Sequence, residues 1–178
     1  MSNLEDMATA THISLEEFHV RFAHESGYEY WFGEAVRKSV PTWLHAILQS
    51  LLAEIFYEHG YFSGSELDLR ISRDFQPRPD VAASLELESP GYPTKPIDIV
   101  AEILSPDDPA EKVFEKCQHY AELGIFQIYV FDPIARSAAQ WNRADQQLER
   151  IDELTLTNGS IVQVATIFIR FDQRLKPL

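Results

Sequence analysis

The sequence is poor in cysteine and in long apolar runs. Its 178 residues include one cysteine, Cys117, so neither an internal disulfide nor a cysteine-rich zinc site can form. No apolar run approaches the roughly 18 residues of a membrane span. The polar, acidic segment 1–11 also lacks the basic-then-apolar layout of a signal peptide. We therefore expect a cytoplasmic protein that has no membrane partner.

Basic residues are scarce as well. Lys and Arg number 15 against 28 Asp and Glu, which gives a formal net charge of −13 at pH 7. That balance excludes a uniformly basic nucleic-acid-binding coat. Hydrophobic residues, by contrast, make up 45% of the chain, enough for a substantial core. We expect one domain over residues 1–178, with residues 1–12 as a flexible lead-in.

The apolar pattern predicts a mixed α/β fold. Helices are expected over 14–27, 41–60 and 108–124, with strands over 67–71, 78–87, 97–104, 126–131, 138–142, 147–151, 161–164 and 167–171, and a hairpin over 28–36. Ser14 and Glu17 form a capping box at the first helix. Asp108, followed by Pro109 and then Glu111, predicts a similar start for the third.

Glu102 is an unusual residue for its position. It lies inside an apolar strand, where an isolated buried charge would cost several kcal/mol. Alternation places Asp98 and Glu102 on one strand face and the three residues Ile99, Ala101 and Ile103 on the other. A simpler interpretation puts Glu102 at the exposed end of the strand.

Asp80 lies near the start of the preceding predicted strand, and a turn over 89–96 separates the two strands. Neighbouring strands could bring Asp80 and Glu102 together, where they would repel unless a cation lay between them. Hard oxygen ligands favour Mg²⁺ or Mn²⁺. The alternative is an ordinary turn aspartate after a proline.

Lys116 lies at the edge of the packed face of the predicted helix 108–124. It is either a lysine whose stem covers apolar surface while its ammonium reaches water, or an ammonium that reaches the two carboxylates. Two carboxylates that hold a metal ion, together with a lysine, form a set of groups that can cleave phosphodiesters. A metal polarises the phosphate and lowers the pKa of a bound water, and the lysine positions that water and offsets developing charge.

These residues belong to a longer pattern. It comprises Pro79-Asp80, Ile97 to Pro106, Glu115 to Tyr120, Gly124 and Val130 to Pro133, with Tyr28-Glu29, Gly33-Glu34, Pro41 and His45 upstream. In order and spacing the pattern resembles the Uma-type (Uma two) family of restriction-endonuclease-like proteins, part of the PD-(D/E)-x-K nuclease superfamily. The resemblance covers most of the chain, from residue 14 to residue 142.

The resemblance implies a restriction-endonuclease-like fold, with a central mixed sheet flanked by helices and an N-terminal helix and hairpin. It also implies Mg²⁺ dependence and DNA as the substrate. Asp80 would be the acid of the PD motif and Glu102 the acid of (D/E)-x-K, both as metal ligands. Because Leu104 occupies the x-K position, Lys116 would be a relocated catalytic lysine.

Five further residues have weaker indications of a role. Glu29 and His45 would support the site, although a solvent-facing hairpin residue and a surface-edge histidine are the alternatives. Arg70, Arg73 and Arg78 would contact DNA, although they also suit a solvated strand edge.

The leading hypothesis is therefore a Mg²⁺-dependent endonuclease that cuts DNA. A second is a nuclease-fold protein that binds without cutting or mainly assembles as a homodimer. A third is a metal-dependent hydrolase of other phosphate esters, because carboxylates with Mg²⁺ serve many such substrates.

Overall fold

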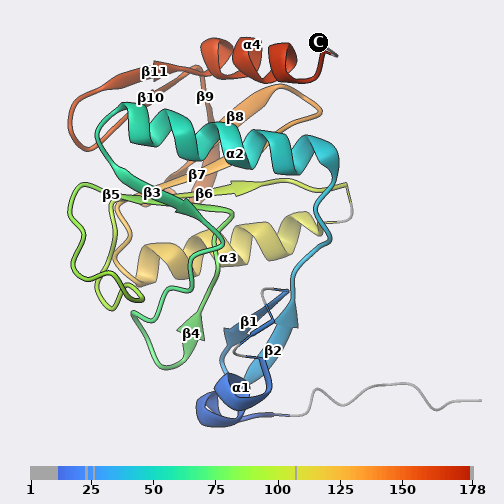
Figure 1. The fold of residues 1–178 in the computed structure, drawn as a ribbon, viewed down its shortest axis with the longest axis vertical. Helices are drawn as coiled ribbons and strands as arrows, with labels where there is room; N and C mark the ends of the chain where they lie inside the picture. The colour runs from blue at the N-terminus through green and yellow to red at the C-terminus, as the bar shows by residue number, and fades with distance from the viewer. Residues whose placement is uncertain (1–11, 23, 26, 107, 177–178) are drawn as a thin grey trace, which may run out of the picture.

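The computed structural model describes residues 12–22, 24–25, 27–106 and 108–176 (Figure 1). The expected flexible lead-in therefore lies, apart from His12, outside the described residues. The elements in chain order are α1 (Leu15–Phe22), β1 (Tyr28–Trp31), β2 (Glu34–Arg37), α2 (Trp43–Glu58), β3 (Phe62–Ser65), β4 (Phe75–Gln76), β5 (Val81–Ser84), β6 (Ile99–Ile103), α3 (Ala110–Glu122), β7 (Gln127–Asp132), β8 (Ser137–Asn142), β9 (Gln147–Ile151), β10 (Glu153–Thr155), β11 (Ile161–Gln163) and α4 (Val164–Arg174).

A six-stranded mixed sheet forms the centre of the fold. Its strand order is β3-β5-β6-β7-β8-β9. Neighbours are antiparallel except β6 and β7, which are parallel. Helix α3 joins these two strands, as a parallel pair requires a crossover connection. The hairpin β1–β2 forms a separate small sheet with β4, and β10 pairs with β11. The expected central mixed sheet with flanking helices is confirmed.

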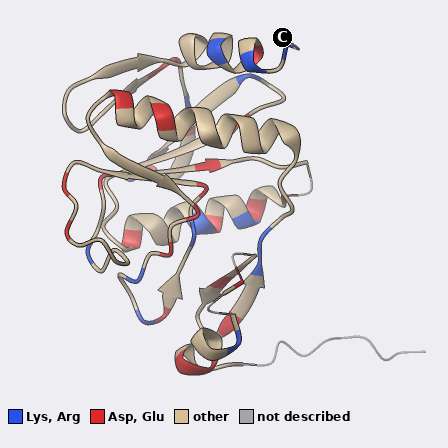
Figure 2. Ribbon diagram, in the orientation of Figure 1, with Lys and Arg blue, Asp and Glu red and all other residues tan. Residues whose placement is uncertain are grey.

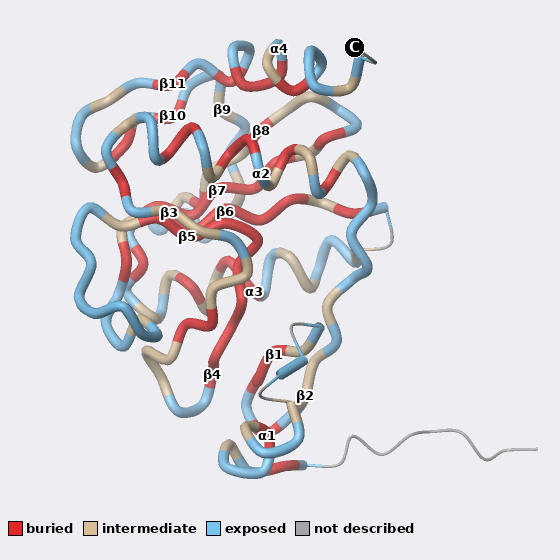
Figure 3. Tube along the Cα trace, viewed as in Figure 1, coloured by how far each residue is buried: buried red, intermediate tan, exposed pale blue. Residues whose placement is uncertain are grey.

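Helices cover both faces of the central sheet (Figure 1). The alternation predicted for β6 sorts its residues between the two layers. Ile99, Ala101 and Ile103 join the core cluster that includes α2 and α4, whereas Val100 joins the cluster beneath α3. Strand β6 is buried along its whole length (Figure 3). Any polar side chain on this strand therefore needs a partner inside the protein.

Several predicted element boundaries are confirmed. The Ser14 hydroxyl accepts a hydrogen bond from the Glu17 main-chain N–H at 3.1 Å, so the cap of α1 is present. Strands β1 and β2 form the expected hairpin. Gly124, with a φ of +85°, follows the end of α3. Helix α2 begins slightly later than predicted, at Trp43, because Thr42 is its N-cap.

The predicted cap of α3 is wrong. The N-cap is Pro109, and no side chain caps the helix there. The Asp108 carboxylate instead accepts a hydrogen bond from the Ser105 main-chain N–H at 2.7 Å and another from the Ser39 hydroxyl. Asp108 thus stabilises the turn between β6 and α3 and links it to the segment that precedes α2.

Two predicted strands are also wrong. Segment 67–71 is irregular because its main chain bonds to two different segments: Leu69 N–H donates to Pro77 and Arg70 N–H to Pro93. The edge strand beside β5 is instead β3, a strand that the apolar pattern did not predict. Segment 167–171 lies in α4, where Phe171 is buried and Ile169 is exposed. The recurrence of the apolar residues Ile167, Ile169 and Phe171 at every second position is coincidental in a segment that is helical.

No helix within residues 12–22, 24–25, 27–106 and 108–176 is both long and apolar enough to cross a membrane. Acidic positions are spread over several helices and loops (Figure 2).

Candidate active site

The register of β5 and β6 places Asp80 opposite Glu102. Val81 pairs with Ala101, so the next residues along the antiparallel ladder face each other. The Ile103 main-chain N–H donates to Asp80 Oδ2 at 2.8 Å, which fixes the Asp80 carboxylate at the strand end. Asp80 is 3% exposed and Glu102 is 8% exposed. The structure therefore brings these two acids together, and Glu102 does not lie at an exposed strand end.

Lys116 reaches this acid pair from α3. Its ammonium lies 2.9 Å from Glu102 Oε1 and 2.8 Å from Glu29 Oε1. The side chain is buried, so the alternative in which its ammonium reaches water is wrong. The hydroxyl of Tyr120, one turn further along α3, donates to Glu102 Oε1 at 2.6 Å. One face of α3 thus positions both the cation and the hydrogen-bond donor that hold Glu102.

Glu29 enters the site from the N-terminal hairpin and is buried, not solvent-facing. Besides the ion pair with Lys116, its Oε1 accepts a hydrogen bond from the Arg78 main-chain N–H at 2.7 Å. Its Oε2 accepts a hydrogen bond from the Trp31 indole at 3.0 Å. Glu29 therefore joins the hairpin, the segment before Asp80 and helix α3.

Two basic side chains approach Asp80 from its other side. Lys38 Nζ and His45 Nε2 each lie 3.3 Å from Asp80 Oδ1. His45 Nδ1 contacts the Ser105 hydroxyl at 3.1 Å. His45 is buried, so the surface-edge alternative is wrong. The structure thus places all five predicted residues of the site core, Asp80, Glu102, Lys116, Glu29 and His45, around one point.

Lys38 was not singled out in the sequence. It follows β2, and its ammonium also donates to Glu66 Oε2 at 2.5 Å and to the Arg78 carbonyl at 2.8 Å. Glu66, also missed, in turn accepts a hydrogen bond from the Gln49 amide at 3.1 Å. Neither Lys38 nor Glu66 lies in a periodic element, so no sequence pattern marks them. One signal could have pointed to a second lysine: the predicted site had more carboxylates than the single ammonium of Lys116 can compensate.

The two facing carboxylates have opposite pKa shifts. Burial raises the pKa of Glu102 to about 7, because it outweighs the stabilising charge of Lys116, and the negative charge of Asp80 adds to the shift. Burial would also raise the pKa of Asp80, but the hydrogen bond from His45 and the charge of Lys38 lower it well below its usual range. Asp80 therefore stays ionised, whereas the nearby positive charge does not fully offset the cost of burying the ionised Glu102 carboxylate.

Lys116 has the complementary shift. Burial alone would lower its pKa, but the nearby carboxylates of Glu102 and Glu29 raise it above its usual range. The ammonium is therefore held in its charged form. Such opposed environments are typical of sites that carry out acid–base or electrostatic chemistry.

The chemistry of these residues fits a divalent cation. Four carboxylates (Glu29, Glu66, Asp80 and Glu102) surround two ammonium groups (Lys38 and Lys116), which leaves two negative charges uncompensated when these six groups are ionised and His45 is neutral. Asp80 and Glu102 line one small cavity of about 60 Å³. Within the described ranges, no group of three His, Cys, Asp or Glu side chains has metal-binding geometry. A cation here would keep several waters, as Mg²⁺ usually does.

The three arginines do not form one surface. Arg78 is buried, and its guanidinium donates to the Glu25 carbonyl at 2.6 Å. Arg70 lies 3.0 Å from Asp68 and is partly buried. The Arg73 side chain is 79% exposed and forms an ion pair at 2.6 Å with Glu16, which is also exposed. Arg70 and Arg73 are therefore available at the surface to different degrees, whereas Arg78 stabilises the fold.

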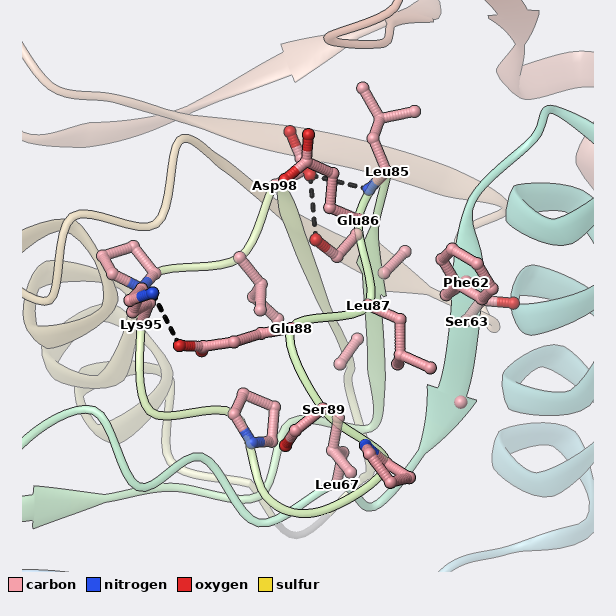
Figure 4. Close-up of a pocket in the computed structure, with 18 of the residues that line it drawn as sticks. Phe62, Ser63, Leu67, Leu85, Glu86, Leu87, Glu88, Ser89, Lys95 and Asp98 are labelled. Carbon is pink, nitrogen blue, oxygen red and sulfur yellow. Dashed lines mark hydrogen bonds and ion pairs between the residues drawn. The ribbon is translucent and has the colours of Figure 1, made fainter.

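A larger cavity of about 650 Å³ lies at the other end of β5 and β6 (Figure 4). Phe62 and Leu87 line it, and Asp98 accepts a hydrogen bond there from the Leu85 main-chain N–H at 2.8 Å. None of its lining residues lines the cavity at Asp80 and Glu102. The two cavities are therefore separate.

The fold is that of a solved protein described as "a putative nuclease belonging to DUF820" from Anabaena variabilis ATCC 29413. The TM-score is 0.72 at 21% sequence identity, over 89% of this chain and 99% of that chain. The DrdV–DNA complex gives a TM-score of 0.40 at 16% identity, over 71% of this chain and 11% of that chain.

A family model described as "Uma2: Putative restriction endonuclease" matches residues 15–168. The chain therefore belongs to the Uma2 family, as its resemblance to the Uma-type proteins predicted. No curated protein matches the sequence.

Proposed function

We propose that this protein is a Mg²⁺-dependent endonuclease with a restriction-endonuclease-like fold that hydrolyses DNA phosphodiester bonds, with Mn²⁺ able to replace Mg²⁺. One observation carries the proposal: Asp80 and Glu102 face each other from adjacent strands, and the Lys116 ammonium lies 2.9 Å from Glu102. The Uma2 family description supports nuclease activity and DNA as the substrate class.

Each residue has a distinct task in this proposal. Asp80 and Glu102 hold the cation, which supplies Lewis acidity toward the phosphate and lowers the pKa of bound water. Lys116 offsets the negative charge that develops on the phosphate and positions the attacking water. Glu29 keeps the Lys116 ammonium charged and in place, and Tyr120 orients Glu102. His45 supports Asp80 through their contact.

Supercoiled plasmid and single-stranded DNA, incubated with the purified protein and Mg²⁺ or Mn²⁺, test the proposal. We expect the wild type to nick or linearise DNA, and Glu102→Gln to lose at least about 100-fold in rate, the scale of one electrostatic catalytic group. Glu86→Gln is the matched control because Glu86 lines the separate cavity. Absence of cleavage by the wild type, or equal rates for Glu102→Gln and wild type, would reject the proposal.

A second candidate is a nuclease-fold protein that binds DNA with little or no cutting, or that acts as a homodimer. Two observations favour it: Leu104 occupies the place of the motif lysine, and the cavity at the acid pair measures only about 60 Å³. A shift of DNA mobility at low salt, together with the absence of cleavage products, would support a protein that binds DNA without cutting it. A stable dimer in light scattering, without any DNA shift, would support the homodimer.

Arg70 and Arg73 are the proposed DNA contacts, whereas Arg78, the third arginine predicted to contact DNA, is buried. Each phosphate contact adds about one unit to the slope of log affinity against log salt. Arg73→Ala should therefore weaken binding and lower that slope by about one unit, with unchanged stability. Arg78→Ala should mainly reduce stability, because Arg78 is buried. If the salt slope of Arg73→Ala equals that of wild type, Arg73 does not contact the DNA backbone.

A further inference from the structure

Both carboxylate oxygens of Asp80 are already engaged. Oδ2 accepts the hydrogen bond from the Ile103 main-chain N–H, which is fixed by the sheet. Oδ1 faces Lys38 Nζ and His45 Nε2, each at 3.3 Å. A cation that binds Asp80 through Oδ1 must therefore displace one of these two side chains.

Lys38 is better able to move than His45. The His45 ring is held by α2 and by its contact with the Ser105 hydroxyl at 3.1 Å. Lys38 has a flexible four-carbon stem and, besides its hydrogen bond to the Arg78 carbonyl at 2.8 Å, a second carboxylate, Glu66, at 2.5 Å. The Glu66 side chain is 34% exposed, whereas that of Asp80 is 4% exposed. Withdrawal from Asp80 toward Glu66 thus moves the ammonium toward solvent without breaking its shorter ion pair.

Glu66 is itself held in place to receive the ammonium. The Gln49 amide donates to Glu66 Oε1 at 3.1 Å and to the Asp80 carbonyl at 2.9 Å. Gln49 therefore spaces Glu66 from Asp80, and the two carboxylates stay on either side of Lys38.

We propose that Lys38 is a positioning residue that acts as the resident counter-ion of Asp80 in the metal-free protein, and that a divalent cation binds by displacing its ammonium toward Glu66. This inference rests on the proposed function, which assigns Asp80 as a ligand. Lys38 then has two effects: it stabilises the buried Asp80 carboxylate when no cation is present, and it competes with the cation for Oδ1.

Isothermal titration of the full chain with Mn²⁺ or Mg²⁺ alone, without DNA, tests the exchange. Lys38→Met should bind Mn²⁺ about tenfold more tightly than wild type, because a competing positive charge has gone. Lys38→Arg, which keeps the charge, should stay near wild type. Lys112→Met is the matched control: Lys112 lines the same cavity, but its ammonium bonds to the Arg37 carbonyl.

Glu66→Gln gives the opposite prediction and covers the case in which Lys38→Met does not fold. Without the Glu66 charge, Lys38 has no second carboxylate and should stay on Asp80, so Mn²⁺ should bind about tenfold more weakly. In a Lys38→Met background the same substitution should have a much smaller effect, because Glu66 acts through Lys38. A double-mutant cycle measures this coupling.

The outcomes separate the inference from the proposed function. If no variant binds Mn²⁺ or Mg²⁺, the metal-dependent function fails and the inference fails with it. If wild type binds but Lys38→Met binds no more tightly than Lys112→Met, only the counter-ion role of Lys38 is rejected. An equal effect of Glu66→Gln in both backgrounds would likewise reject the transfer to Glu66.

Discussion

The Glu29 carboxylate lies 2.8 Å from the Lys116 ammonium, and this ion pair connects the N-terminal hairpin to the helix that follows β6. Both groups are buried, and each has further partners in the site. The hairpin is therefore part of the candidate site and not an appendage to it. Its docking and the placement of Lys116 depend on each other.

The first prediction concerns Glu29. Glu29→Ala should lower the free energy of unfolding by about 3 kcal/mol, because it leaves buried N–H groups unpaired and removes one counter-ion of Lys116. Glu34→Ala, an exposed position of the same hairpin, should change it by less than about 0.5 kcal/mol. Urea unfolding measures both. Equal stabilities of the two variants would contradict the buried location of Glu29.

The second prediction concerns Lys116. Lys116→Met should cost about 3–5 kcal/mol, because it leaves Glu29 and Glu102 buried without their shared cation. Adding Glu102→Gln should restore part of that loss, since one uncompensated charge is removed. Circular dichroism during thermal unfolding compares the single and double variants. A double variant less stable than Lys116→Met alone would contradict this electrostatic account.

The third prediction concerns Tyr129, whose buried hydroxyl has no hydrogen-bond partner among the described residues. Tyr129→Phe should raise the free energy of unfolding by about 1 kcal/mol at neutral pH, because an unpaired polar group is no longer buried. Calorimetry at several pH values measures this effect. A loss of stability at neutral pH would show that the hydroxyl has a partner.

Tyr129 also predicts a pH dependence. Burial raises its pKa above the usual value of 10.0, so the folded state keeps the phenol proton more tightly than the unfolded state. The associated stability is present below pH 10 and is lost as the pH rises above it. Tyr129→Phe should therefore lose less stability than wild type in this alkaline range. Parallel pH profiles for the two proteins would contradict the shift.

The fourth prediction separates a helix from a strand at residues 167–171. Phe171→Ala should cost about 3–5 kcal/mol, because Phe171 packs in the core, while Ile169→Ala should cost under about 1 kcal/mol. A strand would place both residues on one face, so both substitutions would then be costly. Chemical unfolding of the two variants measures the difference.

The sequence indicated that the two acids could face each other, but it left an exposed strand end open for Glu102 and a turn position open for Asp80. Strand alternation fixed the face of Glu102, and two strands joined by a turn brought Asp80 alongside it. Helical spacing marked Lys116, which lies outside both strands, and the family resemblance then assigned it the role of the relocated lysine. Its burial could not be predicted from helical spacing, because the hairpin that covers it is distant in sequence.

The rest of the site depends on tertiary structure. Lys38 and Glu66 lie just outside regular strands, so no periodicity distinguishes them from surface residues. Asp108 had the correct position for a helix cap, but hydrogen bonds to Ser105 and Ser39 hold it instead. Such competition between equally suitable donors is decided by the surrounding fold.

The chain order of the site residues has a consequence for synthesis. All four acids of the cluster (Glu29, Glu66, Asp80 and Glu102) precede Lys116 in the chain. Of the two lysines that pair with these acids, Lys38 is synthesised early, after Glu29 and before the other three acids. A nascent chain that ends before α3 would have to bury these acids with one ammonium group. Because such burial is costly, the hairpin should dock only after α3 has left the ribosome. Helix α3 would then complete the fold and the candidate site in the same step.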